Sequence, residues 1–376
     1  MGPVLRISGR DVFSITVDGL SSKQEAAIRD SLTASDNGAG LGLAPFFSPS
    51  RSMPVMTLSG TRERIKQISR IISASSGFPA ELSKKIDSLL DNYVRSDYKI
   101  DCRGTMLILG GRTRIMGILN VTPDSFSDGG LFADAGKAIS HARDMAAAGA
   151  DIIDIGGEST RPGSEPLAEE EELRRIIPLI ERLSKELAVP ISVDTYKASV
   201  AKKALDAGAS IVNDISGLRF SPDMAKVVAE YGAAVIIMHI KGTPRNMQQN
   251  PVYDDVIGEI MAYLEEGIAI AERAGVDRNK TLIDPGIGFG KTLEHNLAIL
   301  NRLDAFRALG RPIVLGTSRK KFIGKILEIP IPEQRIEGTA ATVAIGIERG
   351  ASIVRVHDVA HMARIVRMTD AIVKPT

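Results

Sequence analysis

The sequence predicts an α/β fold, a (β/α)8 TIM barrel preceded by a small N-terminal α+β domain. Two observations predict the barrel: eight short apolar runs recur between residues 112 and 358, and amphipathic helical stretches separate them. Buried parallel strands are almost wholly apolar, and the active site of such a barrel lies at their carboxyl ends. A third observation predicts an enzyme, because each run ends in or near a polar residue that can do chemistry.

These polar residues follow the order of the runs along the chain. They are Asn120 after Ile115–Leu119, Asp154 within Ile152–Ile155, Asp194 after Pro190–Val193, Asn213 and Asp214 after Ile211–Val212, His239 after Val235–Met238, Asp284 after Leu282–Ile283, Ser318, Arg319 and Lys320 beyond Ile313–Leu315, and Arg355 and His357 in and after Ile353–Val356. We expect them to meet at one mouth of the barrel.

The helical stretches between the runs have recognisable ends. We expect helices at residues 134–148, 168–187, 197–207, 222–231, 254–274, 294–309, 333–349 and 359–373. Five of them are followed by a glycine, which favours the left-handed residue that ends a helix: Gly149, Gly208, Gly232, Gly275 and Gly350. The acidic run Glu169–Glu172 suits a helix start electrostatically, and we expect it to be solvated.

Composition limits the class of protein. The net charge of +1 on 376 residues gives no argument for nucleic acid or an anionic membrane as a partner. Cys102 is the single cysteine, which excludes an internal disulfide framework and suits a reducing compartment. The longest apolar run, Ala233–Met238, is far shorter than the roughly 20 residues of a membrane span, and the N-terminus lacks the apolar core of a signal peptide. We therefore expect a soluble cytoplasmic protein.

Residues 1–95 differ from the barrel of residues 96–376. A hairpin of Val4–Ile7 and Val12–Val17 around Gly9–Asp11, a helix at Ser22–Leu32, a mobile loop at 34–53, a strand at Val55–Leu58 and helices at Thr61–Ser73 and Pro79–Val94 are expected here. This domain carries no constellation of catalytic residue types. We favour a stabilising role over oligomerisation or shaping of the barrel mouth.

Two loops after the first two strands are too polar for simple connectors. The loop at residues 120–130 contains proline and paired glycines and is expected to act as a lid, with Asn120 pointing into the mouth. In the next loop Arg161 stands between Thr160 and Pro162, which presents it stiffly to an anion or an aromatic ring.

The sequences of these loops resemble those of the dihydropteroate synthase family. NVTPDSFSDGG at 120–130 and DIGGESTRPGSEP at 154–166 carry the resemblance, and SVDT, VNDISG, IMH, DPGIGFGKT, SRKKF and VRVHDV follow in the family's order at 192–195, 212–217, 237–239, 284–292, 318–322 and 354–359. The resemblance covers about residues 103–373 and leaves residues 1–95 outside.

The resemblance implies the condensation of 6-hydroxymethyl-7,8-dihydropterin pyrophosphate with p-aminobenzoate, which releases pyrophosphate. By resemblance, the pterin is held by Asp194, Asn213, Met238 and Asp284, with Lys320 on the opposite side of its ring. A pterin edge has adjacent N–H donors that a buried carboxylate can accept.

By resemblance also, Arg355 and His357 bind the leaving pyrophosphate, and Asn120 ligates Mg²⁺. Arg355 and His357 lie two residues apart on one strand, so their side chains share a face. Few protein ligands are needed, since Mg²⁺ keeps several waters.

The acceptor is expected to be framed by Thr160, Arg161, Pro162 and Phe289, with Arg161 near its carboxylate. We expect a dissociative displacement in which Mg²⁺, Arg355 and His357 pull on the leaving group, while Asp194 and Asp284 favour the developing pterin cation. The catalytic residues expected are Asp194, Lys320, Arg355 and His357. Members of the family are commonly homodimers.

One departure leaves an alternative open. Many members have serine after the lysine of the SRK motif, whereas this chain has Lys321. A second cation could accept a modified or more anionic arylamine. A corrinoid-dependent methyltransferase that binds methyltetrahydrofolate, and a pterin-binding regulator without activity, are two weaker alternatives.

Three further patterns are set aside. Lys291-Thr292 looks like the end of a phosphate-binding loop, but the required glycine is Pro285. His357 and His361 lie four apart, yet the first ends a strand, so zinc is not expected. Cys102 precedes the barrel and is expected to be inert.

Overall fold

The structure is a computed structural model that describes residues 4–8, 13–18, 26, 44–46, 55–74, 80–121 and 130–374. It divides into two compact units. One comprises Met1–Arg95 with Asp304–Gly310, and the other comprises Ser96–Leu303 with Arg311–Thr376.

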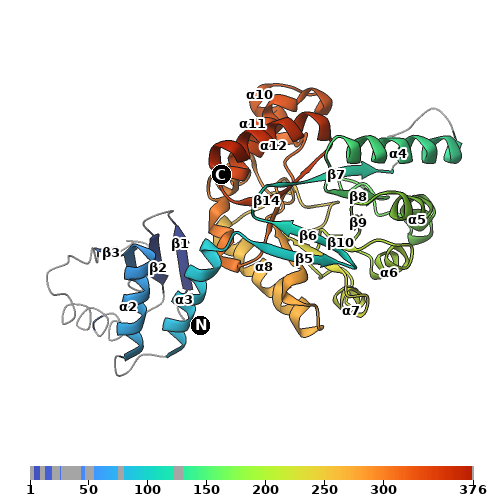
Figure 1. Ribbon diagram of the computed structural model, residues 1–376. Helices are drawn as coiled ribbons and strands as arrows, with labels where there is room; N and C mark the ends of the chain where they lie inside the picture. Colours follow the sequence, from blue (N-terminus) through green and yellow to red (C-terminus); the bar gives the residue numbers. More distant parts are fainter. Residues whose placement is uncertain are drawn as a thin grey trace. The chain divides into compact units, whose positions relative to one another are not determined.

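The larger unit contains a closed parallel barrel of eight strands, which confirms the predicted fold class (Figure 1). The strands are β7 (Arg114–Asn120), β8 (Ile152–Gly156), β9 (Ile191–Asp194), β10 (Ile211–Asp214), β11 (Ala234–Met238), β12 (Thr281–Asp284), β13 (Ile313–Leu315) and β14 (Ala351–Val356). β14 pairs with β7 in parallel and so closes the barrel. Most of these strands are buried along their whole length, which explains their continuous apolar runs.

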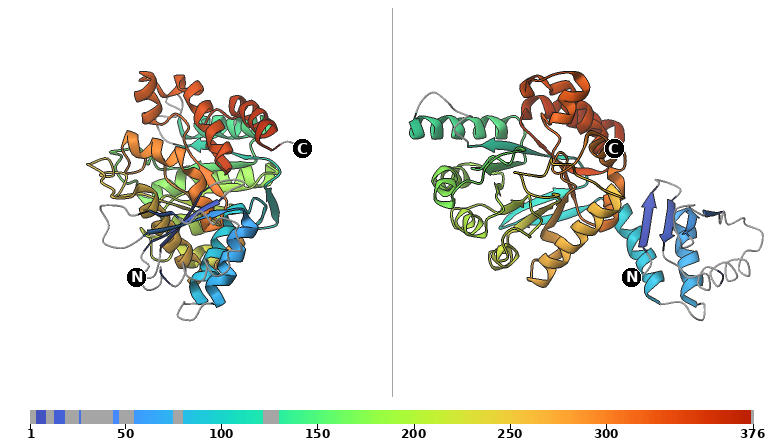
Figure 2. Two further views of the ribbon diagram at one scale, coloured as in Figure 1. Left: turned by 90° about the vertical axis from the view of Figure 1, so that its left-hand side faces the viewer. Right: turned by 180° about the vertical axis from the view of Figure 1, so that it is seen from behind.

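Helices surround these strands, as the two further views in Figure 2 also show. They are α4 (Gly130–Ala147), α5 (Glu169–Glu186), α6 (Ala198–Asp206), α7 (Met224–Glu230), α8 (Val256–Arg273), α9 (Leu293–Asn301), α10 (Lys321–Leu327), α11 (Ile336–Glu348) and α12 (Val359–Val373). The five glycines expected after helices all have positive φ, between 57° and 113°. None of the helices in the described residues is long and apolar enough to cross a membrane.

Several details differ from the sequence predictions, and one is the helix predicted at 134–148, which begins at Gly130. The helix predicted at 294–309 ends at Asn301, and a 3-10 segment, Leu303–Leu309, follows. The helix predicted at 333–349 begins at Ile336, after a 3-10 turn. α10 was not predicted, because its seven residues are too few to show a helical period. The acidic run is not all solvated, since Glu172 is fully buried in the first turn of α5.

A hairpin that the sequence did not predict precedes the barrel. β5 (Tyr98–Cys102) pairs antiparallel with β6 (Thr105–Leu109). One face of the hairpin, which includes Ile100 and Leu109, joins a core cluster with residues from the N-terminal halves of barrel strands. The hairpin therefore packs against the end of the barrel opposite to the strand ends that carry the polar residues.

The smaller unit contains a four-stranded antiparallel sheet in the order β1-β2-β4-β3. Its elements are β1 (Val4–Ser8), β2 (Phe13–Asp18), β3 (Ala44–Phe46), β4 (Val55–Gly60), α2 (Arg62–Ala74) and α3 (Ala80–Val94). The predicted hairpin is confirmed, with Ile7 opposite Ile15. Its turn at Gly9–Asp11 lies outside the described residues, and so does the helix predicted at Ser22–Leu32 apart from Ala26, which is helical. Within the predicted loop at 34–53, residues 44–46 form a strand instead.

Candidate active site

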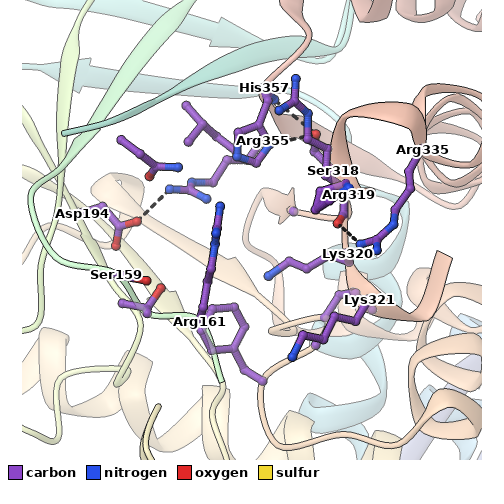
Figure 3. Close-up of a pocket in the computed structure, with 18 of the residues that line it drawn as sticks. Ser159, Arg161, Asp194, Ser318, Arg319, Lys320, Lys321, Arg335, Arg355 and His357 are labelled. Carbon is purple, nitrogen blue, oxygen red and sulfur yellow. Dashed lines mark hydrogen bonds and ion pairs between the residues drawn. The ribbon is translucent and has the colours of Figure 1, made fainter. Parts of the chain in front are cut away.

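The carboxyl ends of the barrel strands surround an open cavity of about 1440 Å³. The polar residues predicted at strand ends line it from several strands, with Asn120, Asp194, Asn213, Asp284, Lys320, Arg355 and His357 among them. Met238, Phe289, Thr160, Arg161, Pro162 and Lys321 line it too. Figure 3 shows Arg161, Lys320 and Arg355 pointing into this cavity. One cavity thus contains every residue that the sequence analysis gave a substrate or metal role, whereas three strand-end residues expected at the mouth, Asp154, Asp214 and His239, do not line it.

Arg355 is held between two carboxylates. Its Nε donates to Asp154 Oδ2 at 2.7 Å. Its Nη2 donates to Asp194 Oδ2 at 2.7 Å, and Figure 3 shows this second bond. Asn213 Nδ2 also donates to Asp154 Oδ2, at 3.1 Å. These bonds use one edge of the guanidinium, and Nη1 makes no hydrogen bond to the residues that the structure describes. Arg355 can therefore bind an anion without leaving the two aspartates.

The two aspartates have spare acceptor atoms. Oδ1 of Asp154 and Oδ1 of Asp194 are buried and accept no hydrogen bond from the described part of the chain. Burial raises the pKa of Asp194 to about 7, although Arg355 opposes the rise. A buried carboxylate oxygen without a donor is costly, so a ligand that brings N–H groups would relieve that cost at Asp194.

Asp284 and Lys320 form another part of the site. The backbone N–H of Gly286 donates to Asp284 Oδ1 at 2.7 Å, and burial raises the pKa of this aspartate. Burial also lowers the pKa of Lys320 to about 8. The Lys320 ammonium lies 4.2 Å from the centre of the Phe289 ring. Glycine is favoured at position 288, because its φ of +83° strains other residues and a Cβ atom would lie 3.2 Å from Lys320 Cδ.

His357 is oriented by Ser318. Its Nδ1 lies 3.1 Å from Ser318 Oγ, and its backbone N–H donates to the same oxygen at 3.2 Å (Figure 3). Burial and the nearby Arg319 lower the pKa of His357 to about 3, so the imidazole is neutral near pH 7. A neutral ring contributes a hydrogen bond to a phosphate rather than a positive charge.

The loop at residues 157–168, between β8 and α5, supplies Thr160, Arg161 and Pro162 to the cavity. Arg161 is exposed, while its two neighbours are half-buried. Gly163 ends this stretch with a φ of +85°, and its N–H donates to the carbonyl of Pro244 at 3.0 Å. The arginine is thus presented from a short loop that is fixed at a turn.

Asn120 ends β7 and is the predicted Mg²⁺ ligand. Its side chain lines the cavity and makes no hydrogen bond to the described residues. The described residues contain no group of three or more His, Cys, Asp or Glu side chains that could hold a metal. Mg²⁺ takes hard oxygen donors and keeps several waters, so the amide oxygen of Asn120 is a suitable single protein ligand for it. The rest of the predicted lid, residues 122–129, lies outside the described residues.

Several residues that act around the site had no predicted role. Asp154 stood out as an acid in an apolar strand, but nothing in the sequence showed that it pairs with Arg355. Lys291 is buried, with Nζ 2.8 Å from His239 Nδ1 and 2.9 Å from the Phe289 carbonyl. Its neighbourhood was set aside because it lacks the pattern of a phosphate-binding loop. The signal that could have revealed it is a lysine in a glycine-rich loop directly after a strand end.

Comparisons with known proteins place these residues in a family. The model of the family described as "Pterin binding enzyme" matches residues 116–357. Dihydropteroate synthase of Bacillus subtilis strain 168 is 55% identical over 260 residues, which cover 69% of this chain and 88% of that protein. Dihydropteroate synthase of Escherichia coli K12 is 45% identical over 273 residues, which cover 73% of this chain and 96% of that protein.

Solved structures agree with the sequence comparisons. Dihydropteroate synthase of Xanthomonas albilineans, crystallised with 4-aminobenzoic acid, has a TM-score of 0.70 and 44% identity, and the match covers 75% of this chain and all of that one. The enzyme of Clostridium difficile, in the presence of pteroic acid, has a TM-score of 0.67 and 52% identity, with 70% of this chain and 98% of that one covered. The chain belongs to the pterin-binding enzyme family, among its dihydropteroate synthases.

Proposed function

We propose that this protein joins 6-hydroxymethyl-7,8-dihydropterin pyrophosphate to p-aminobenzoate and so forms 7,8-dihydropteroate and pyrophosphate. The observation that carries the proposal is one cavity lined by two carboxylates, Asp194 and Asp284, and two cations, Lys320 and Arg355, of which Asp284 is buried and the other three are partly buried. A pterin offers N–H donors to the two carboxylates and acceptor atoms to the two cations.

The pterin would lie among the deeper residues of the cavity. Its N–H groups would donate to Asp194 Oδ1 and to Asp284, while Asn213 and Lys320 would contact its other polar atoms. Met238, which is 5% exposed and lines the cavity, would supply apolar contact. Ionised Asp194 and Asp284 would also stabilise the positive charge that develops on the pterin methylene carbon.

The leaving pyrophosphate would be held by Arg355 Nη1 and His357. Asn120 would hold Mg²⁺ beside it, and the bound ion would neutralise charge on the pyrophosphate oxygens. The C–O bond to pyrophosphate breaks, the electron pair stays on the departing oxygen, and the amine nitrogen forms the new C–N bond and then loses a proton. An aromatic amine is nucleophilic when neutral, so no residue has to act as a general base.

The acceptor would be held by Arg161, Thr160, Pro162 and Phe289, with Arg161 facing its carboxylate. Lys321 is exposed and lines the same cavity. The positive charge of Lys321 favours an anionic arylamine, and this acceptor could be larger than p-aminobenzoate.

The decisive experiment measures pyrophosphate release from the pterin pyrophosphate with Mg²⁺, with and without p-aminobenzoate. We expect release that depends on p-aminobenzoate and matches dihydropteroate in amount. Pterin binding without such turnover would contradict the proposed acceptor and point to a modified arylamine, with Lys321 as the first residue to test. Failure to bind the pterin would overturn the proposed function altogether.

We also propose that the protein is a homodimer in the cytoplasm. Ile345 of α11 and Met368 and Ile372 of α12 are 50%, 64% and 66% exposed, and these helices pack against each other. Apolar side chains on neighbouring helices favour a protein interface. A chain with one cysteine forms no internal disulfide that would call for an oxidising compartment. Analytical ultracentrifugation of the protein would test the dimer.

A further inference from the structure

The ammonium group of Lys197 lies at the centre of a buried hydrogen-bonded cluster beside the site. Lys197 follows Asp194 by three residues and is the N-cap residue of α6. Its Nζ donates to Glu158 Oε2 at 2.5 Å, to Glu172 Oε2 at 2.6 Å and to the Leu167 carbonyl at 2.6 Å. A lysine ammonium has three N–H donors, and all of them are used here. Lys197 therefore has no donor left for a substrate.

The three acceptors bracket the loop that carries Arg161. Glu158 lies near the start of the 157–168 loop, Leu167 lies near its end, and Glu172 is in the first turn of α5 that follows. One cation thus ties together both ends of the loop. Residues 159–166 lie between these ties, and they include Thr160, Arg161 and Pro162.

Further contacts hold the start of the loop. Tyr196 Oη donates to Glu158 Oε1 at 2.7 Å, so both oxygens of this carboxylate have donors. Arg175 Nη1 donates to the Gly157 carbonyl at 2.9 Å. The loop therefore begins from a backbone that is fixed by side chains of α5 and of the β9–α6 connection.

The burial of these charges shows that the cluster has to be complete. The side chains of Lys197, Glu158 and Glu172 are 12%, 7% and 1% exposed. Burial raises the pKa of Glu172, although Lys197 opposes the rise. Removal of one partner from a buried ion pair leaves an uncompensated charge and is strongly destabilising. Two carboxylates that share one ammonium are held close together only while that ammonium is present.

We propose that Lys197 is a positioning residue for the acceptor, since it fixes both ends of the 157–168 loop so that Thr160 and Arg161 face the cavity. The inference rests on the proposed function for its effect on the acceptor. Lys197 does not touch the substrates and acts through the loop alone. Asp194 ends β9 and Lys197 caps α6, so the residue that fixes the acceptor loop lies three positions after the aspartate proposed to bind the pterin.

The test compares Lys197→Met with a matched control, Lys280→Met. Methionine keeps the unbranched stem of the side chain as far as Cε and removes the ammonium group. Lys280 Nζ donates to Asp101 Oδ2 at 2.9 Å and to the Gly232 carbonyl at 2.9 Å, and both partners lie at the opposite end of the barrel. The control therefore also removes an ammonium from a carboxylate and a carbonyl, but far from the loop. A further variant, Lys197→Met with Glu172→Gln, removes one of the carboxylates that would otherwise repel each other.

We expect Lys197→Met, alone and with Glu172→Gln, to raise the KM for p-aminobenzoate about tenfold or more, because a loop misplaced by about 1 Å is costly. The KM for the pterin pyrophosphate should stay within about twofold. Lys280→Met should change neither constant, and Lys197→Arg should recover part of the acceptor KM. An equal rise in both KM values, or an unchanged acceptor KM, would overturn the inference.

Hydrogen exchange gives a readout that does not depend on activity. Amides of residues 157–168 should exchange faster in Lys197→Met than in wild type, and Lys280→Met should leave them unchanged. Unchanged exchange in Lys197→Met would also overturn the inference. A wild type without p-aminobenzoate-dependent turnover would overturn the proposed function, while exchange in this loop would still decide whether Lys197 holds it.

Discussion

The carboxylate of Asp194 has one oxygen that is paired and one that is available to a ligand. One of its oxygens pairs with Arg355 at 2.7 Å, and the other is buried without a donor from the described residues. Arg355 and Lys320 lower its pKa, whereas burial, Asp154 and Glu172 raise it, and burial dominates. The carboxylate therefore gains most from a ligand that brings its own N–H donors.

This environment predicts that pterin binding depends on pH. Because the pKa of Asp194 in the free protein is about 7, protonation competes with binding at lower pH. Affinity should level off above about pH 8 and fall by up to about tenfold per pH unit well below pH 7. Calorimetric titration between pH 5.5 and 8.5, with a pterin that does not itself titrate in this range, measures the effect. Asp194→Asn should bind weakly with a flat profile, and equal wild-type affinity at pH 6 and pH 8 would contradict the assignment.

Arg161 is predicted to serve the acceptor alone. Arg161→Ala removes a charge-assisted hydrogen bond of about 1.5–3 kcal/mol to the acceptor carboxylate, so the KM for p-aminobenzoate should rise about 10- to 100-fold. Affinity for the pterin should not change. Arg174→Ala is a suitable control, because this exposed arginine pairs with Glu171 on α5. An unchanged acceptor KM in Arg161→Ala would refute the role.

Among the elements of the fold, the β5–β6 hairpin contributes to the core of the barrel and does not line the cavity. Its inner face, with Ile100 fully buried, joins a core cluster with Met116, Ile152 and Ile353 of the barrel strands. Its turn is tied by Arg103 Nη1, which donates to the Leu205 and Ala209 carbonyls, each at 2.6 Å. All these contacts lie away from the strand ends that line the cavity.

Truncation of the hairpin core should therefore reduce stability without altering the site. Ile100→Ala removes buried methyl groups and should lower the free energy of unfolding by about 2–5 kcal/mol. Denaturant unfolding measures the loss. The KM values for both substrates should equal those of the wild type below the unfolding transition, and a changed KM would show that the hairpin influences the cavity.

At the scale of the whole molecule, the barrel brings residues from distant parts of the chain to one cavity. Arg355 pairs with aspartates that lie 201 and 161 residues away in the sequence. Such a site exists only when the barrel has closed, because its strands come from the whole length of the larger unit. Ligands that bind these residues should therefore stabilise the fold as a whole.

We expect the pterin pyrophosphate with Mg²⁺ to raise the midpoint of thermal unfolding. A ligand at 100 times its dissociation constant adds about 2.7 kcal/mol to the free energy of unfolding. Chelation of Mg²⁺ with EDTA should reduce the effect of the pterin pyrophosphate, and it should leave the effect of a pterin without phosphates unchanged. Equal stabilisation by the pterin pyrophosphate with and without EDTA would contradict a role for the metal at Asn120.

The sequence by itself determined the barrel, the order of its strands and the residues at the strand ends. It did so because a buried parallel strand appears in the sequence as an apolar run, and because the carboxyl ends of all eight strands surround one mouth. The hairpin was missed since its second strand, Thr105–Leu109, does not alternate: Met106 and Ile108 are apolar yet 54% and 52% exposed. A pattern of side-chain polarity alone did not reveal which face was buried.

Only the tertiary structure decided which charged groups pair. Glu172 reads as one acid in a solvated run, yet it is fully buried and shares the ammonium of Lys197 with Glu158. Asp154 reads as a lone acid in a strand, yet it holds Arg355 and Asn213. The strength of such a pair depends on the distance between its members and on their removal from water. The distance and the burial of a pair are set by the folded barrel and cannot be read from the order of residues in the sequence.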